Sequence, residues 1–320
     1  MTFTFRPAVR ENVGLLIGLM GSSGSGKTFT AMRLAKGMAG DKAFAVIDTE
    51  AGRAKHYADR FRFDHGDLKP PFSPAAYADA IAAADAAGYP VVVVDSFSHE
   101  HAGDGGILDM QDAEFQRMGG KEAARMASWI KPKMEHKRMV QRLLQVRAHL
   151  ILCFRAESKI EMVKERDEDG RLRTKVVPKQ SPVSVDGWIP ICEKNLPYEL
   201  TASFLLMADR PGVPRPIKLE EQHRPLIPLD TPITEETGRG LAEWARGGAT
   251  SSAPTSPGPS TRRPSLIAEV KRLKGKLQLT DDEVRAYRTT HLDGQDIQVA
   301  PEPKIESLVD ELKRRAGEAA

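Results

Sequence analysis

The residues GSSGSGKT at positions 21–28 have the spacing G-x-x-x-x-G-K-[ST], which is typical of a loop that holds phosphate groups. Glycines let the backbone wrap around an anion so that successive N–H groups point at it. Lys27 can then contact the β- and γ-phosphates, and the Thr28 hydroxyl can bind Mg²⁺. The alternative is a flexible turn before an ordinary helix. We expect ATP to contact these residues: Gly21, Ser22, Ser23, Gly24, Ser25, Gly26, Lys27, Thr28 and Phe29.

Two acidic residues complete a candidate hydrolytic site. Asp95 ends the apolar run VVVVD, where a carboxylate near the phosphate loop supports Mg²⁺. Glu50 stands two residues beyond Asp48, and a carboxylate there could deprotonate the water that attacks the γ-phosphate. The alternatives are an ordinary strand-ending acid and a solvated loop acid. We predict Glu50, Lys27 and Asp95 as catalytic residues, Thr28 and Asp95 as metal ligands, and ATP and Mg²⁺ as the bound groups.

The elements that must position these residues alternate between short runs rich in β-branched residues and longer segments with helical period. This alternation predicts an α/β fold with a mostly parallel central sheet. One expected helix has clear signals at both ends. It begins after Ser73, which can cap it, with Pro74 at its first position, and it ends before Gly88. The expected strands span 15–20, 43–48, 90–95, 149–154 and 201–208. The expected helices span 27–38, 74–87, 132–146 and 235–245.

The stretch IDTEAGRAKHYA around Glu50 resembles RecA-type recombinases, whose second strand ends in the same ID-x-E form before the same Tyr-Ala spacing, here Tyr57 and Ala58. The resemblance extends through YPVVVVDSFS, KEAARMASWI and HLILCFRAES and covers residues 15–157. It implies a RecA-like P-loop NTPase fold, a glutamate that activates water, and a homo-oligomeric ring or filament. RecA proteins carry a glutamine just past the fourth strand, whereas Arg155 and Ala156 stand here.

Within this class, the segments VIDTEAGRAKHYA, PPFSPAAYADAIAAADAAGYPVVVVDSFSHE and PITEETGRGLAEW look most like phage and prophage nucleotide-binding proteins of the AAA/RecA-like kind. That likeness spans residues 14–245, and the group includes core-only recombinases that promote single-strand annealing. It implies action on single-stranded DNA in phage recombination, annealing or replication. An ATP-dependent switch or adaptor with little hydrolysis is the second hypothesis. A small-molecule kinase is the third, against which the IDTE strand end argues.

The segment 155–180 predicts a projecting β-hairpin, with arms at 160–164 and 172–177 around the turn DEDG. In RecA-like proteins the loop after the fourth strand touches DNA, and basic residues there would give salt-dependent binding. The alternative is a solvated hairpin with cross-strand ion pairs, because acids are interleaved and aromatic residues are lacking. The expected DNA or phosphate contacts are Arg155, Lys159, Arg171 and Arg173.

The segment SHEHAGDGG places His99 and His101 near Glu100 and Asp104, a set that could bind a metal. No closing set of ligands is evident, so a polar loop near the γ-phosphate is the stronger interpretation. The helix expected over 132–146 is interpreted as core-facing, with a basic outer face.

The stretch GGATSSAPTSPGPSTRRP indicates a disordered linker over 247–264. It divides a P-loop ATPase domain, 1–246, from a small basic helical module, 265–320, in which Thr280 and Glu283 fit a capping box. A tethered basic module suits recruitment of DNA or of a protein partner. A solvated helix that aids solubility is the alternative.

The net charge of +3 permits nucleic-acid binding but does not argue for it. No run approaches the ~20 apolar residues of a membrane span, and the first residues lack the apolar core of a secretion signal. Cys153 and Cys192 lie in apolar surroundings, which favours reduced core thiols. We therefore expect a soluble, intracellular protein with no membrane partner. The resemblance to phage and prophage proteins implies that it is phage or prophage encoded and acts in the cytoplasm of the bacterial host.

Overall fold

The computed structural model describes residues 10, 13–166, 172–247, 262–297 and 300–317. Contacts divide the chain into two units, Met1–Gly248 and Ala249–Ala320. In the described part of the first unit, eight strands form one sheet in the order β10-β9-β1-β5-β4-β2-β3, with β8 paired to β5. The strands are β1 (Leu16–Gly21), β2 (Phe44–Asp48), β3 (Phe63–Asp67), β4 (Val91–Asp95), β5 (His149–Ser158), β8 (Trp188–Pro190), β9 (Ala202–Leu206) and β10 (Pro214–Lys218).

All neighbours in this sheet run parallel except β8 and β10, which confirms the expected mostly parallel α/β fold. The five expected strands are present. The pattern missed β3, β8 and β10 for physical reasons. Strand β3 is a polar edge strand, FDHGD, with no buried residue. Strand β10 contains Pro214 and Pro216, which an edge strand tolerates because one side of its backbone needs no ladder hydrogen bonds.

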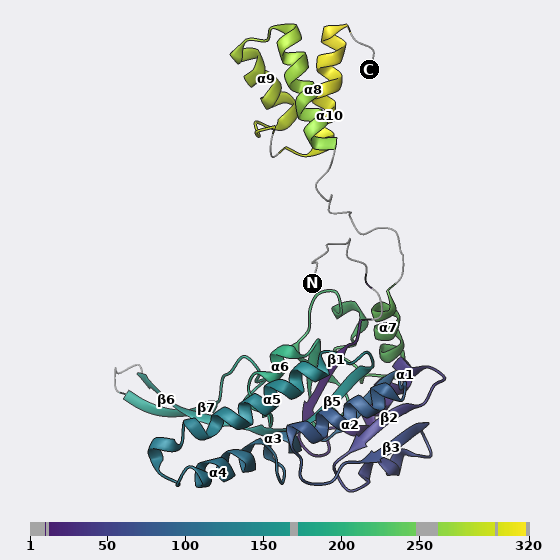
Figure 1. Cartoon of the computed structure of the whole chain (residues 1–320), viewed down its shortest axis with the longest axis vertical. Helices are drawn as coiled ribbons and strands as arrows, with labels where there is room; N and C mark the ends of the chain where they lie inside the picture. Colours follow the sequence, from purple (N-terminus) through teal and green to yellow (C-terminus); the bar gives the residue numbers. More distant parts are fainter. Residues whose placement is uncertain (1–9, 11–12, 167–171, 248–261, 298–299, 318–320) are drawn as a thin grey trace. The chain divides into compact units, whose positions relative to one another are not determined.

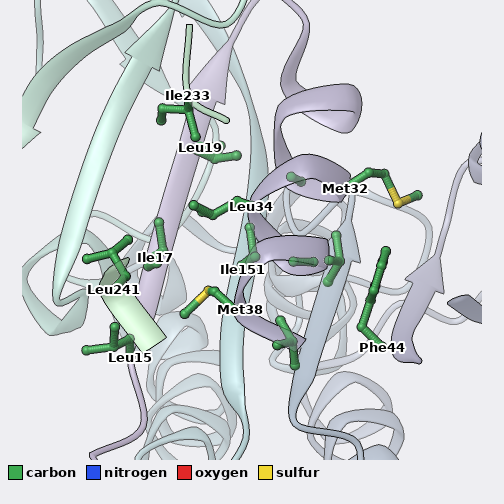
Figure 2. Close-up of a cluster of buried hydrophobic side chains, with 14 of the residues drawn as sticks. Leu15, Ile17, Leu19, Met32, Leu34, Met38, Phe44, Ile151, Ile233 and Leu241 are labelled. Atoms are coloured by element: carbon green, nitrogen blue, oxygen red, sulfur yellow. The ribbon is translucent and has the colours of Figure 1, made fainter. Parts of the chain in front are cut away.

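Helices cover both faces of the sheet. Helices α1 (Lys27–Ala39) and α7 (Glu235–Arg246) cover one face, and α2 (Pro74–Ala86) and α5 (Ile130–Leu143) cover the other. Successive side chains of a strand point to opposite faces. Ile17 and Leu19 therefore join the α1–α7 core, which Figure 2 shows, whereas Leu16 and Met20 join the α2–α5 core.

Glycines allow α1 and α7 to approach each other closely. A Cβ atom on Gly238 would lie 2.2 Å from the Leu34 carbonyl oxygen, and one on Gly37 would lie 1.9 Å from that of Glu235. The Arg33 guanidinium adds a two-pronged ion pair with the Glu235 carboxylate, at 2.7 to 3.0 Å. Helix α7 is therefore firmly attached to the helix that follows the phosphate loop.

The segment after β4 forms helices rather than the expected polar loop. The shorter elements of the first unit are α3 (His99–Ala102), α4 (Ile107–Arg117), α6 (Leu196–Glu199) and the 3₁₀ helices η1 (Arg53–Tyr57), η2 (Glu122–Ala124), η3 (Ala127–Trp129) and η4 (Arg224–Leu226). Strands β6 (Ile160–Arg166) and β7 (Leu172–Pro178) pair antiparallel, as the hairpin prediction requires. They extend beyond the helices that cover the sheet (Figure 1). The turn DEDG and Arg171 lie outside the described residues.

The described part of the second unit consists of three helices, α8 (Arg262–Leu277), α9 (Asp281–Leu292) and α10 (Glu302–Ala316). The predicted capping box is present: the Thr280 hydroxyl accepts the Glu283 N–H, and the Glu283 carboxylate accepts the Thr280 N–H at 3.0 Å. Most of the expected linker, 248–261, lies outside the described residues. Residues 262–264 belong to α8 instead, because a proline in the first turn of a helix loses no helical hydrogen bond.

Candidate functional site

The loop over residues 21–28 joins the end of β1 to the start of α1. Gly24 and Gly26 have φ angles of 78° and 81°, a left-handed conformation that other residues adopt only with strain. The buried Ser25 hydroxyl donates to the Ser22 carbonyl at 2.9 Å, and the Ser25 carbonyl accepts the Gly212 N–H at 3.1 Å. The loop therefore holds a defined curve at the electropositive end of α1.

The Lys27 ammonium group lies inside this curve. It donates to the carbonyl oxygens of Gly21 at 2.9 Å and Ser22 at 2.7 Å. Burial lowers the pKa of Lys27 and outweighs the opposite effect of the acidic groups around it. The ammonium is thus placed where the phosphates of a nucleotide enter the loop.

Thr28 and Asp95 form a pair of oxygen donors beside Lys27. The Thr28 hydroxyl donates to Oδ2 of Asp95 at 2.5 Å. Asp95 ends β4 and is buried, and this burial raises its pKa to about 6, against the hydrogen bond from Thr28 and together with the negative charge of Glu50. A hydroxyl and a carboxylate side by side are the hard oxygen ligands that Mg²⁺ takes in phosphate-binding loops. The pair therefore fits the predicted metal site.

A backbone anchor that the sequence reasoning missed sets the position of Glu50. The Asp48 carboxylate, at the end of β2, accepts the N–H groups of Glu50 at 2.6 Å and Ala54 at 2.8 Å. His65 on β3 lies 3.2 Å from the same carboxylate. The spacing of Asp48 and Glu50 could have suggested this role, because an Asp side chain commonly accepts the N–H two residues on.

Glu50 is held from both sides by arginines. Arg155 donates to Oε1 through Nη2 at 2.7 Å and Nε at 3.2 Å, and Arg53 donates to Oε2 at 2.8 Å. Burial pushes the pKa of Glu50 upward, but these two guanidinium groups outweigh it and lower the pKa overall. Arg155 reaches this place because it lies opposite Gly21 in the β1–β5 register.

These groups meet in one cleft of about 690 Å³, a volume in the range of small-molecule sites. The predicted ATP-site residues that line it are Gly21, Ser22, Ser23, Gly24, Gly26, Lys27, Thr28, Phe29, Glu50 and Asp95. The predicted contact Ser25 is fully buried and is not part of the lining. The sequence reasoning missed Arg53, His56, Tyr57 and Ile191, which also line it. Helix η1 carries the first three and has no helical periodicity long enough to predict. Ile191 comes from a distant loop, so no local pattern signals it.

Three of the four residues expected to contact DNA or phosphate are described, and they lie in different surroundings. Arg155 lies in the cleft, and Lys159 pairs with Glu157 at 2.8 Å. Arg173 faces Glu165 in the hairpin register, and Arg171 lies outside the described residues. The cross-strand ion pairs of the alternative interpretation are present on this face, where Lys175 pairs with Glu165 at 3.4 Å.

The histidine segment after β4 holds no metal cluster among the described residues. The Nδ1 atom of His99 lies 2.8 Å from the Thr49 hydroxyl, next to Glu50 in the chain. Glu100 is fully buried and pairs with His136 of α5 at 2.8 Å. The segment therefore ties α3 to the Glu50 loop and to α5. Both cysteines are free thiols.

A mostly parallel sheet, a glycine-rich loop between strand and helix, and a Thr–Asp oxygen pair beside the loop lysine define a nucleotide-binding P-loop NTPase. The chain belongs to the AAA domain family, whose model matches residues 14–189. A search of curated proteins gave no match. In the described part of the chain, no helix is both long and apolar enough to cross a bilayer.

Proposed function

We propose that the protein hydrolyses ATP and uses the turnover to act on single-stranded DNA in phage or prophage recombination, annealing or replication. The observation that supports hydrolysis is the position of the Glu50 side chain. This side chain is only 13% exposed and lines the same cleft as Lys27 and the Thr28–Asp95 pair. A protein that only holds a nucleotide needs no positioned carboxylate at this place.

Each residue of the cleft has its own role in the proposed hydrolysis. Lys27 and the N–H groups of residues 21–28 bind the phosphates of ATP, and Thr28 and Asp95 hold Mg²⁺. The ion, when bound, neutralises charge on the β- and γ-phosphates. Glu50 accepts the proton of the attacking water on a carboxylate oxygen. Asp48 keeps the Glu50 backbone in place for that transfer.

Arg155 links nucleotide binding to the availability of Glu50. A carboxylate that two arginines hold is a weak base, because its pKa lies below its usual range. The γ-phosphate of ATP offers Arg155 a more highly charged partner in the same cleft. Movement of Arg155 to that phosphate releases Oε1 of Glu50 for the water. In RecA proteins the glutamine just past the fourth strand senses the γ-phosphate. We propose that Arg155 has this role here.

The hairpin supplies a surface suited to single-stranded DNA. Side chains paired across an antiparallel ladder share a face. One face is built from Ile160, Met162, Lys164, Arg166, Leu172, Thr174, Val176 and Pro178, a set with two cations and no acid. Met162 is 78% exposed and Ile160 is 68% exposed. Cations suit the phosphates and apolar side chains suit the bases of a single strand. We also propose a ring or filament, on the RecA resemblance alone.

Substitutions at the cleft test the hydrolytic proposal. We expect Lys27→Ala to lose ATP binding. We expect Glu50→Gln to keep ATP binding and lose about 10²–10⁴ in turnover, the usual contribution of a general base. Glu157→Gln, whose carboxylate pairs with Lys159 outside the cleft, is the matched control and should turn over ATP normally. Full turnover by Glu50→Gln would remove it from the role of base.

The DNA part is tested by ATP turnover with and without single-stranded DNA at low and high salt. Stimulation that fades with salt supports action on DNA. The lowered pKa of Glu50 favours a second candidate, a nucleotide-dependent switch or adaptor in phage packaging or replication. Tight ATP binding with negligible turnover, whether or not DNA is present, would establish that function instead.

A further inference from the structure

The helices of the second unit leave an apolar groove. Helix α10 packs against both α8 and α9, whereas α8 and α9 approach each other far less closely. A cavity of about 200 Å³ lies between these two helices, over Leu308 and Leu312 of α10 (Figure 1 shows the three helices). This volume exceeds that of an engineered cavity that binds benzene, so the groove can take an aromatic side chain.

The walls of the groove follow from helical spacing. Ile267, Val270 and Lys271 lie on one face of α8, and Val284 and Tyr287 lie on one face of α9. Except for Lys271, these residues are half-buried. Val270 and Tyr287 also pack against the small core of the unit, so they contact the core on one side and the groove on the other. Part of the groove wall therefore consists of side chains that also stabilise the three helices.

Cations dominate the rim. Lys271, Lys274 and Arg288 line the groove, with Asp296 as the acid among its lining residues. Asp296 already pairs with Arg288 at 3.0 Å. Within the described residues, Lys271 and Lys274 have no ion-pair partner. An apolar centre with an excess of unpaired positive charge at its edge is complementary to a ligand that has an apolar group at its centre and negative charges around it.

We propose that this groove binds an acidic peptide of a partner protein, with one aromatic or large aliphatic side chain inserted between α8 and α9 and acidic residues against Lys271 and Lys274. The apolar side chain supplies burial, and the acids supply charge complementarity. The bases of a nucleic acid carry N–H and C=O groups that this apolar groove would leave without hydrogen-bond partners, whereas a phenyl or aliphatic side chain brings none. The unit therefore recruits a partner to the chain that carries the ATP site.

The test uses the full-length protein and fluorescence anisotropy of labelled probes. The first probe is a short peptide with Asp and Glu around one Phe. The second has Ser in place of that Phe, and the third is an oligothymidine of equal charge. We expect the first to bind, and the Ser peptide and the oligothymidine to bind at least about tenfold more weakly. Raising the salt from about 0.05 to about 0.5 M should weaken the binding.

Charge-reversed variants assign the binding to the groove. The double variant Lys271→Glu/Lys274→Glu should weaken peptide binding by about tenfold, because attraction at the rim becomes repulsion. Lys313→Glu/Arg314→Glu, on α10 and outside the groove, reverses the same number of charges and is the matched control, which should bind normally. Both changes leave the ATP cleft intact, so ATP turnover should not change. Circular dichroism melting shows that each variant is folded.

Three outcomes of the binding measurements would overturn the proposal, and a fourth would come from the oligomeric state. One is no binding of the Phe peptide by the full-length protein. Another is equal binding of the Ser peptide or of oligothymidine. The last is undiminished peptide binding by the folded double variant. A change of oligomeric state in the double variant would assign the groove to a second copy of the chain and would likewise overturn it.

Discussion

Two N–H groups of Arg155 hold a single carboxylate oxygen of Glu50, Nη2 at 2.7 Å and Nε at 3.2 Å. The second oxygen accepts a hydrogen bond from Arg53. Both carboxylate oxygens of the candidate base therefore accept hydrogen bonds from arginines. Its availability depends on an arginine that comes from a different strand, β5, next to the phosphate loop.

We expect Arg155→Ala to raise the pKa of Glu50. The hydrogen bonds and positive charge of Arg155 are the chief influences that lower this pKa against the effect of burial. Carbon NMR of the Glu50 carboxyl group during a pH titration measures the change. Arg138→Ala, which removes an arginine paired with Glu135 on α5, should leave the Glu50 titration unchanged. An unshifted pKa in Arg155→Ala would contradict the inferred pairing.

Asp95→Asn should stabilise the nucleotide-free protein at pH 7.5. Burial raises the pKa of Asp95 from 3.8 to about 6, so the folded state binds the proton more tightly than the unfolded state. The cost of the buried charge is small below pH 3.8, grows as the pH rises from 3.8 to about 6, and is fully present above that range. We expect a gain on the order of 2 kcal/mol in unfolding free energy at pH 7.5.

Urea unfolding measures this difference. Tryptophan fluorescence reports the first unit alone, because all three tryptophans lie within residues 129–244. The advantage of Asp95→Asn should shrink as the pH falls from 7.5 to below 5. A difference that is independent of pH would show that Asp95 does not titrate in this window.

Gly238→Ala should destabilise the first unit by about 3 kcal/mol, because its Cβ would lie 2.2 Å from the Leu34 carbonyl oxygen and force α7 away from α1. Gly240→Ala, in the same helix, is the matched control. Its Cβ would meet only Leu226, at an ordinary 3.7 Å. It should stabilise by about 0.5–1 kcal/mol through the higher helix propensity of alanine. Urea unfolding distinguishes the two, and equal stability of both variants would contradict the close approach.

Lys164→Glu/Arg166→Glu should weaken binding of single-stranded DNA by about tenfold and reduce its salt dependence, because two cations leave the acid-free face of the hairpin. Arg173→Glu/Lys175→Glu reverses the same number of charges on the opposite face, beside Glu165, and should have a much smaller effect. Fluorescence anisotropy with labelled oligothymidine measures both. Equal losses in the two variants would mean that the hairpin acts through net charge and not through one face.

The sequence predicted the elements that carry the cleft, because short buried strands and a glycine-rich loop leave strong local signals. Lys27, Thr28, Asp95 and Glu50 lie in or beside such elements, and all four line the predicted cleft. The pattern did not predict β3, whose FDHGD run is neither buried nor alternating in hydropathy.

The rest of the site depends on long-range contacts. No local sequence pattern predicts that Arg155 pairs with the carboxylate of Glu50, 105 residues earlier in the chain, or that Ile191 lines the cleft. Register likewise decides which residues of the two strands share a face of the hairpin: a shift of one residue would place Arg173 and Lys175 on the face of Lys164. Residue types alone therefore identified the hairpin as basic, whereas its pairing places Arg173 and Lys175 beside Glu165 and not beside Lys164.

Two of the three N–H groups of the Lys27 ammonium donate to carbonyl oxygens of the loop, those of Gly21 and Ser22. To gain more than the third N–H group and the ammonium charge, an incoming anion must replace these hydrogen bonds. A polyphosphate brings several oxygen atoms to one loop and can do so, whereas chloride brings a single diffuse charge. The carbonyl oxygens of the loop thus compete with phosphate for the Lys27 ammonium group. This competition favours ligands that present several oxygen atoms.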